Sequence, residues 1–364
     1  MRTPSFRLLV GDNRDLIRTL TDNSVDAIVT DPPYGLADPK SLGVRDMLRH
    51  WLDGGEAETK GAGFMNRKWD AAVPQPPIWR EALRVLKPGG HLLAFGGSRT
   101  YDLVVLGLRL AGFEIRDQLQ WVYGCGMNKV GYVKTADGRQ VVPGWGGALR
   151  PAHEPIAVAR KPVEGTLTSN LAAWGTGALN IDGCRVEAEG GDGPSRWPTN
   201  FIHDGGPEVL AAFPDAPGQL APTRGDHAPM HNAIYGAMRH GTSSKAPRRD
   251  ATASAARFFY CAKASPTDRS EGLAGKNPHV TVKPTALMRY LCRLVTPAGG
   301  TVLDPFAGSG STGKAALLEG FSFLGFELDP EYAVAALARL EHAARSRLNE
   351  PLTFNFGTEP PAAA

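Results

Sequence analysis

The chain has 364 residues, of which 42% are hydrophobic, and a formal net charge of +3 at pH 7. This length suffices for a large α/β domain with an insertion or for two domains, and so small a charge is not diagnostic of a polyanionic partner. No apolar run reaches the roughly 18 residues of a membrane helix, and the stretch Met1 to Val10 is too short in apolar residues for a secretory signal, so we expect a cytoplasmic protein.

An alternation of strands and helices is predicted from about residue 8 to residue 123. The predicted elements are a strand over 26–30, a helix over 78–86, a sharp turn at 87–90, a strand over 91–95, a helix over 98–110 and a strand over 113–123. In the last of these strands, apolar and polar residues alternate, which is typical of a half-buried strand. This half is expected to supply several layers of an α/β sheet.

Directly after the first predicted strand come Asp31, Pro32, Pro33 and Tyr34. Two consecutive prolines fix the backbone and remove two donors, so the strand cannot continue and the carbonyls around Pro32 remain available as acceptors. Rigid acceptors beside an aromatic ring suit a flat substrate that carries an amine. The alternative is that these four residues only end a strand and begin a loop.

The middle of the chain, residues 124–256, is rich in Gly, Pro, Trp, Asn and Arg and has little periodicity outside 156–160. Such a stretch is expected to be a recognition insertion, part of it mobile within 212–256. One basic cluster stands out, and its charge is opposed only by Asp250; its members are Arg239, His240, Lys245, Arg248, Arg249 and Arg257. A solvated loop is the alternative interpretation of this cluster.

After residue 256 the α/β pattern returns. The predicted elements are a strand over 257–262, a helix over 285–295, a strand over 301–303, a turn over 304–310, a helix over 311–319, a strand over 321–327 and a helix over 331–347. They form a βαβ unit with an extra helix on each side. A flexible tail is expected over 349–364.

The turn over 304–310 lies where a strand leads into a helix, which is where α/β sheets bind ligands. Gly308, Gly310 and Gly313 satisfy a dinucleotide fingerprint and nearly satisfy a P-loop, but Ala315 stands where a P-loop needs a hydroxyl. Asp304 at the mouth of the turn would repel a pyrophosphate and attract an ammonium. S-adenosylmethionine has such an ammonium and no phosphate.

Glu327 ends the next predicted strand, where an acid can accept hydrogen bonds from both hydroxyls of a ribose. The alternative for Glu327 is a surface acid ahead of the last helix. Metal ligation is not indicated, because the four cysteines are widely spaced and Pro229 separates His227 from His231 without the glutamate of a metalloprotease motif.

Taken together, these motifs resemble the amino-methylating DNA methyltransferases, of the permuted group in which the catalytic motif precedes the cofactor motif. Residues 31–34 match the catalytic motif, Gly11-Asp12 an acidic turn, and Phe326-Glu327 the ribose acid. Residues 279–284 match the segment before the cofactor helix, although the family more often has proline where this chain has Val280. The cofactor-binding residues that the resemblance implies are Asp12, Asp31, Lys283, Asp304, Phe306, Ala307, Gly308, Ser309, Gly310, Ser311 and Glu327.

The resemblance implies a Rossmann-like, circularly permuted S-adenosylmethionine-dependent methyltransferase sheet. Its parts would be a catalytic half (1–123), a target-recognition insertion (124–256), a cofactor half (257–348) and the tail (349–364). The expected partner is double-stranded DNA, with a homodimer plausible and any restriction nuclease a separate protein. The DNA-contacting residues expected in the insertion are Arg196, Trp197, Asn200, Arg248 and Arg249.

In the mechanism that the resemblance implies, the Asp31 carboxylate and the Pro32 carbonyl hold the amine of a flipped-out base, and Tyr34 stacks on its ring. The leading function is transfer of a methyl group to the N6 amine of adenine, because cytosine-amine members more often have Ser at the position of Asp31. Cytosine N4 remains the alternative. Two more distant alternatives are a nicotinamide-dependent oxidoreductase and a catalytically silent DNA-binding module.

No cysteine follows a proline in this chain, so the pattern of the carbon-methylating enzymes, which attack the base with a thiolate, is absent.

Overall fold

The structure is a computed structural model of the chain. It describes residues 4–36, 43–58, 63, 68–124, 126, 131–186, 195–215, 230–232, 236–238, 254–262, 265 and 267–348.

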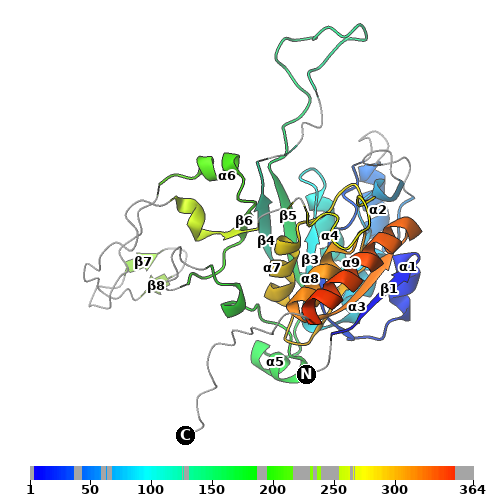
Figure 1. Ribbon diagram of the computed structural model, residues 1–364, viewed down its shortest axis with the longest axis vertical. Helices are drawn as coiled ribbons and strands as arrows, with labels where there is room; N and C mark the ends of the chain where they lie inside the picture. Colours follow the sequence, from blue (N-terminus) through cyan, green and yellow to red (C-terminus); the bar gives the residue numbers. More distant parts are fainter. Residues whose placement is uncertain are drawn as a thin grey trace.

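A mixed sheet forms the centre of the described part of the chain (Figure 1). Its nine strands lie in the order β1-β11-β10-β2-β3-β5-β4-β6-β9. All neighbours are parallel except at β5, which runs antiparallel to both β3 and β4. The strands are β1 (Phe6–Val10), β2 (Val25–Thr30), β3 (Leu86–Phe95), β4 (Glu114–Val122), β5 (His153–Arg160), β6 (Phe201–His203), β9 (Tyr260–Cys261), β10 (Thr301–Asp304) and β11 (Ser322–Glu327).

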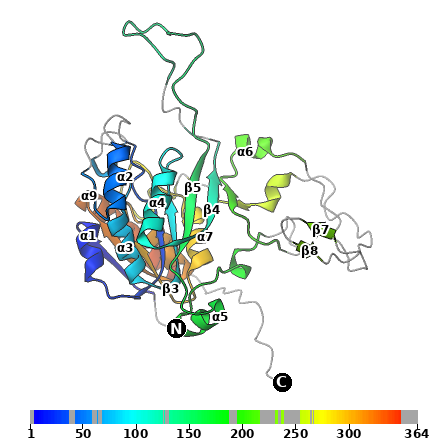
Figure 2. The same ribbon diagram turned by 180° about the vertical axis from the view of Figure 1, so that it is seen from behind.

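Helices cover both faces of this sheet. Along β2 and β3, alternate side chains enter two separate cores: Val29 packs with α7, α8 and α9, whereas Ile28 packs with α2, α3 and α4. The first helical layer is in front in Figure 1 and the second in Figure 2. The helices are α1 (Asn13–Leu16), α2 (Val44–Leu52), α3 (Pro76–Val85), α4 (Tyr101–Ala111), α5 (Leu167–Trp174), α6 (Pro207–Ala212), α7 (Thr285–Val295), α8 (Ser311–Glu319) and α9 (Pro330–Leu348).

Smaller elements complete the described part. The strands β7 (Met230–Asn232) and β8 (Gly236–Met238) pair with each other, and short 3-10 turns occupy Ile17–Thr19, Lys68–Asp70, Asp182–Cys184 and Ala255–Phe258. Between β4 and β5, residues 131–150 form a long projecting arm whose residues are all exposed (Figure 1). None of the helices in the described residues is long and apolar enough to span a membrane.

Most predicted elements are confirmed, and α7 and α8 have the bounds that the sequence predicts. The sharp turn at 87–90 is wrong, because these residues lie inside β3. They form an irregularity in the pairing with β2, where the register shifts between Val25 and Ala27. Gly89 makes this possible: its φ is +76°, and a Cβ there would lie 2.5 Å from Nδ2 of Asn170.

Two further expectations change. The strand predicted over 257–262 shortens to Tyr260–Cys261, because Ala255–Phe258 form a 3-10 turn in which the Ser254 side chain caps the amide of Ala256. The middle segment is less irregular than predicted, since it supplies β5 and β6 to the central sheet. From Pro155 onward β5 is wholly buried, and its residues as far as Ala159 form a continuous apolar run rather than an alternating one.

Candidate active site

The two motifs that the sequence singles out meet at one edge of the sheet. β2 ends at Thr30 and β10 ends at Asp304, and these strands are parallel neighbours, with Leu303 opposite Ile28. A buried hydrogen bond of 2.6 Å runs from the Thr30 hydroxyl to Oδ1 of Asp304. Asp31 and the glycine turn therefore start side by side although they lie far apart in the sequence.

Asp31 belongs to a compact ionic cluster. Its Oδ2 accepts a hydrogen bond of 2.6 Å from Nζ of Lys283, and its Oδ1 accepts one of 2.9 Å from the Tyr34 hydroxyl. Glu154 is the second carboxylate of the cluster, since its Oε2 lies 3.1 Å from Nζ of Lys283 and 2.9 Å from the Tyr34 hydroxyl. Lys283, which the sequence assigns to the cofactor, thus contacts the catalytic motif directly.

Hydrogen bonds hold the backbone of Tyr34 at both its amide and its carbonyl. Its amide donates to Oδ1 of Asp70 at 2.7 Å, and its carbonyl accepts from the Thr100 hydroxyl at 2.6 Å. Burial, followed by the charges of Asp31 and Glu154, raises the pKa of Tyr34 well above its usual value, so the phenol stays protonated. In this structure the hydroxyl is bound within the cluster.

The glycine turn gathers the predicted cofactor residues around one backbone bend. Gly310, at φ +76°, precedes α8, and a Cβ on Gly308 would lie 2.9 Å from Nε2 of His279. The Ala307 amide donates to the Phe326 carbonyl at 2.8 Å, which ties the turn to β11. Asp304 beneath it is 2% exposed and also accepts from the Phe306 amide at 3.0 Å.

Glu327 faces this turn. Its Oε2 accepts from the Gly308 amide at 2.7 Å and its Oε1 from the Asp329 amide at 2.8 Å, so the interpretation as a simple surface acid is wrong. Burial raises the pKa of Glu327 to about 7 and that of Asp304 to about 6. Both carboxyls therefore titrate near physiological pH, and a bound cation would favour their ionised forms.

Two buried basic residues near the turn have structural partners. Arg339, 0% exposed on α9, donates from Nη1 to the Ser309 carbonyl at 2.6 Å and to the Ser311 hydroxyl at 3.2 Å. Lys314, at the position of a P-loop lysine, instead donates to Asp268 at 2.6 Å and Glu271 at 2.5 Å. Its charge is thereby neutralised by two carboxylates, which argues against a polyphosphate ligand at this turn.

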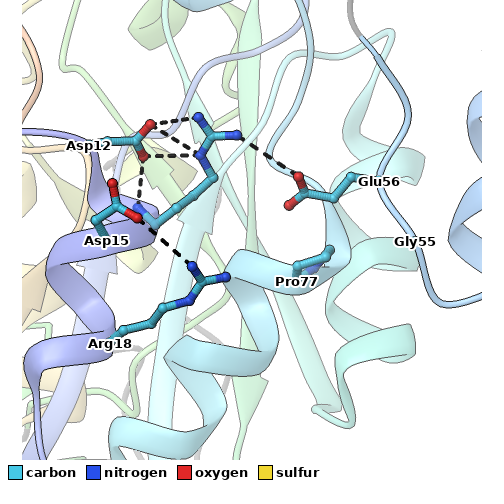
Figure 3. A pocket seen from close by; sticks show the side chains of 7 residues that line it. Asp12, Asp15, Arg18, Gly55, Glu56 and Pro77 are labelled. Carbon is cyan, nitrogen blue, oxygen red and sulfur yellow. Dashed lines mark hydrogen bonds and ion pairs between the residues drawn. The ribbon is translucent and has the colours of Figure 1, made fainter.

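Asp12 lies beside the same turn, because the Gly11 amide donates to the Glu327 carbonyl at 2.9 Å and the Asn13 side chain donates to the Pro305 carbonyl at 3.0 Å. The guanidinium of Arg14, 2.6 Å from Asp12, lowers the pKa of that carboxyl. Asp12 also lines an open pocket of about 470 Å³. The side chains around it are drawn in Figure 3. The lining residues are Asp12, Arg14, Asp15, Arg18, Gly55, Glu56 and Pro77.

Three of the predicted DNA-contacting residues lie in the described part of the chain: Arg196, Trp197 and Asn200. Arg196 stacks over Phe258 at 4.6 Å, and the Asn200 side chain donates to Asp117 of β4 at 3.3 Å. Trp197 is 64% exposed. Arg248 and Arg249 lie outside the described residues, as does His227. In the part of the chain that the structure covers, no group of three or more His, Cys, Asp or Glu side chains is arranged for a metal ion.

Glu154 and Arg339 are the site residues that the sequence analysis missed. Glu154 is the second residue of β5 and comes directly before the buried part of that strand, so a carboxylate at the start of an apolar run was the available signal. Arg339 lies within the amphipathic pattern of a long helix, where a buried arginine resembles a surface one. Nothing in the sequence distinguishes it.

Comparison with known proteins identifies the family. The N6_N4_Mtase family, described as DNA methylase, matches residues 25–338. The Type II methyltransferase M.HindIII of Haemophilus influenzae is 27% identical over 340 residues, covering 85% of this chain and 87% of its own. The DNA adenine methyltransferase YhdJ of Escherichia coli is 40% identical over 72 residues, covering 20% of this chain and 24% of its own.

Among solved structures, the cytosine-N4-specific PvuII DNA methyltransferase aligns with 96% of this chain and 96% of its own, at a TM-score of 0.50 and 14% identity, which shows a shared fold. An S-adenosylmethionine complex of a DNA modification methylase from Thermus thermophilus aligns at a TM-score of 0.44 and 20% identity, covering 93% of this chain and 96% of its own. Because the family match spans most of the sequence, the chain belongs to the N6/N4 family of DNA methyltransferases.

Proposed function

We propose that this DNA methyltransferase transfers a methyl group from S-adenosylmethionine to the exocyclic N6 amine of adenine in double-stranded DNA. The observation that carries the proposal is the position of Asp31 next to the glycine turn, at the ends of neighbouring strands. An acceptor for an amine and a turn suited to a cationic ligand then face the same space. Direct transfer between two bound groups requires such proximity.

The residues around the turn fit S-adenosylmethionine. Backbone amides and small side chains at 307–311 leave room for a ligand close to the main chain, and Asp304 and Glu327 supply carboxylates for an ammonium and for ribose hydroxyls. Asp12, beside the turn, is available for the remaining end of the cofactor. When bound, the sulfonium supplies an activated methyl group.

The protein's part in the transfer is to make a poor nucleophile reactive. The lone pair of an exocyclic amine is delocalised into the base, and hydrogen bonds from the amine to the Asp31 carboxylate and the Pro32 carbonyl favour a pyramidal nitrogen. The base must leave the duplex to reach this position. In the proposal, Tyr34 releases its hydroxyl from the cluster and stacks on the ring.

Adenine is proposed over cytosine because the motif begins with Asp31, where cytosine-amine members of the family more often have Ser. The relative YhdJ, named a DNA adenine methyltransferase, points the same way, whereas the structural neighbour from PvuII is named cytosine-N4-specific. The sheet order also supports a permuted arrangement, since the cofactor turn follows β10 late in the sequence yet lies beside β2.

DNA contacts are proposed for the segment 124–256. The exposed Trp197 and the arginines Arg196, Arg248 and Arg249 would reach bases or phosphates, and the Asn200 amide would read a base edge. The division into halves 1–123 and 257–348 around this segment, and a homodimer, belong to the same proposal.

Incubation of the enzyme with DNA and methyl-deuterated S-adenosylmethionine, followed by mass analysis of the nucleosides, tests the assignment. We expect labelled N6-methyladenine. Labelled N4-methylcytosine would overturn the choice of base, and unlabelled DNA would overturn the proposed reaction. In parallel, S-adenosylhomocysteine should raise the melting temperature while a nicotinamide dinucleotide should not, which distinguishes the oxidoreductase alternative.

A further inference from the structure

Glu154 is a charged residue in the active site that neither the motifs nor the family match explains. β5 runs antiparallel to β3, and Ile156 pairs with Phe95, so β5 begins at the edge of the sheet where β3 ends. Glu154 therefore reaches the site from the opposite side of β3 to Asp31. Its side chain is 20% exposed, close to the 22% of Asp31.

Lys283 lies between these two carboxylates, over the Phe95 ring at 4.8 Å, and its side chain is 9% exposed. Its ammonium has three N–H groups and three acceptors: Asp31 at 2.6 Å, Glu154 at 3.1 Å and the Tyr34 hydroxyl oxygen at 3.1 Å. An ammonium removed from water is tolerated when all of its protons are bound and its charge is compensated. Here one carboxylate would suffice for neutrality, and the cluster has two.

The second carboxylate changes the charge of the site. With a protonated Tyr34, the cluster of Asp31, Glu154 and Lys283 has a net charge of −1. If Glu154 were neutral, Lys283 would be matched to Asp31 alone and would hold that carboxylate more strongly, at the expense of an incoming amine. Glu154 shares the ammonium and so leaves acceptor capacity on Asp31.

From this arrangement we propose that Glu154 is a positioning residue. It shares the hydrogen bonds of the Lys283 ammonium with Asp31. It also gives the amine-binding cluster a net charge of −1, which favours a sulfonium over a neutral thioether. The inference rests on the proposed function: if Asp31 holds the amine, the sulfonium that donates the methyl group must lie beside this cluster. It assigns the discrimination between methyl donor and spent product to a residue outside both motifs.

The variant Glu154→Gln tests this, since its amide oxygen still accepts a hydrogen bond while the charge is gone. The matched control is Glu114→Gln, which removes another carboxylate paired with a buried cation, 2.6 Å from Arg160, at the far end of β4 and β5. Binding of S-adenosylmethionine and of S-adenosylhomocysteine is measured by calorimetry for each protein. Single-turnover transfer to DNA is then measured at saturating concentrations of both substrates.

We expect E154Q to lose at least about tenfold of its preference for S-adenosylmethionine over S-adenosylhomocysteine, because the negative charge that attracts the sulfonium is removed. Its transfer rate should fall about 10- to 100-fold, because Asp31 is held away from the amine. Glu154→Asp should restore most of the preference, and E114Q should match the wild type in both measurements.

If Glu154 had a merely structural role, E154Q would bind both ligands more weakly by the same factor, and this result would overturn the inference. An unchanged preference together with an unchanged transfer rate would overturn it as well. Glu154→Ala provides the same comparison without an amide, should E154Q be unstable. If the wild-type protein binds neither ligand and methylates no DNA, the proposed function fails instead, so the two failures are distinguishable.

Discussion

Burial shifts the pKa values of His91 and Glu327 in opposite directions. His91 on β3 is 3% exposed, and its burial, with Arg160 and Arg116 nearby, lowers its pKa to about 4. An imidazole kept neutral in the fold is protonated first in the unfolded chain, which then binds more protons as the pH falls. His91 therefore stabilises the fold above its usual pKa of about 6.5 and loses that contribution between pH 6.5 and pH 4.

The variant His91→Leu has no ionisable group at this position. Between pH 7 and pH 4 the wild type should lose about 3 kcal/mol more of its free energy of unfolding than H91L loses, as measured by urea titrations at several pH values. Taking the difference between the two proteins cancels the other titrating groups, Glu327 and Asp304 included. Parallel pH dependences for the two proteins would contradict the assignment.

Glu327 shifts in the opposite direction, since burial raises its pKa to about 7. Its contribution to the stability of the unliganded fold is present at low pH and lost as the pH rises through 7, because the buried carboxylate must then ionise. A ligand whose hydroxyls donate to the carboxylate prefers the ionised form. Binding of S-adenosylmethionine should consequently strengthen as the pH rises from about 6 to about 8.

Calorimetry across this range should show the dependence in the wild type and its loss in Glu327→Gln, which should also bind at least tenfold more weakly. Asp304, with a pKa of about 6, remains in both proteins and accounts for any change at the acid end. A variant that retains the full pH dependence would remove Glu327 from the ribose site.

Among the elements, α8 shows how closely the C-terminal part of the chain is packed. Gly313 lies in its first turns, and a Cβ there would be 2.4 Å from Cδ2 of Leu340 on α9 and 2.5 Å from Cε1 of Phe323 on β11. Glycine thus allows α8 to lie against both neighbours at once, which keeps the N-terminus of the helix in line with the turn. Helix propensity and packing make opposite predictions for its replacement.

Propensity alone would make Gly313→Ala stabilising by up to about 1 kcal/mol. Because neither α9 nor β11 can move without disturbing the core, we expect destabilisation of about 1–3 kcal/mol instead, measured by chemical denaturation. The control is Gly275→Ala, where a Cβ would meet nothing within 4 Å and stability should stay within about 0.5 kcal/mol. A G313A protein as stable as wild type would show that this packing is looser than described.

Elements with a clear hydrophobic period could be predicted from the sequence, and those fixed by long-range contacts could not. α7 has an apolar face, and both α7 and α8 have glycine or proline at their ends, so their bounds follow from local chemistry. The bulge at Gly89 depends on Asn170, and the 3-10 turn before β9 depends on the Ser254 cap. Neither partner can be identified from local pattern.

The site divides in the same way. Asp31, Asp304 and Glu327 follow strands and could be found by motif, because each ends a recognisable apolar run. Glu154 enters the cluster only through the antiparallel placement of β5, and Arg339 only through the packing of α9 on the turn. Where a side chain's role is set by tertiary neighbours, the sequence alone does not report it.

Over the whole molecule, the two halves of the chain are interleaved. β10 and β11 from the C-terminal part lie between β1 and β2 from the N-terminal part. The strand pairs β1–β11 and β10–β2 therefore join the two parts in one sheet. This arrangement brings the acceptors after β2 to the turn after β10. It also means that residues 1–123 do not contain a continuous sheet of their own.

A fragment of residues 1–123 should therefore lack a cooperative unfolding transition, whereas the full chain should unfold cooperatively, as followed by circular dichroism in urea. The expected cause is exposure of both edges that β10 and β11 cover. The full chain, which supplies β10 and β11 itself, serves as the control. A fragment with a sharp transition would show that the halves fold independently.

The most direct test of the central claim is the turnover of Asp31→Ala beside its affinity for S-adenosylmethionine. Asp46→Ala, at an exposed position of α2, is the matched control. Loss of the acceptor that holds the amine should lower methyl transfer to DNA at least 100-fold at saturating cofactor, while the dissociation constant of the cofactor rises by no more than about tenfold, as in E154Q. A D31A enzyme that methylates DNA at a near-normal rate would contradict the account.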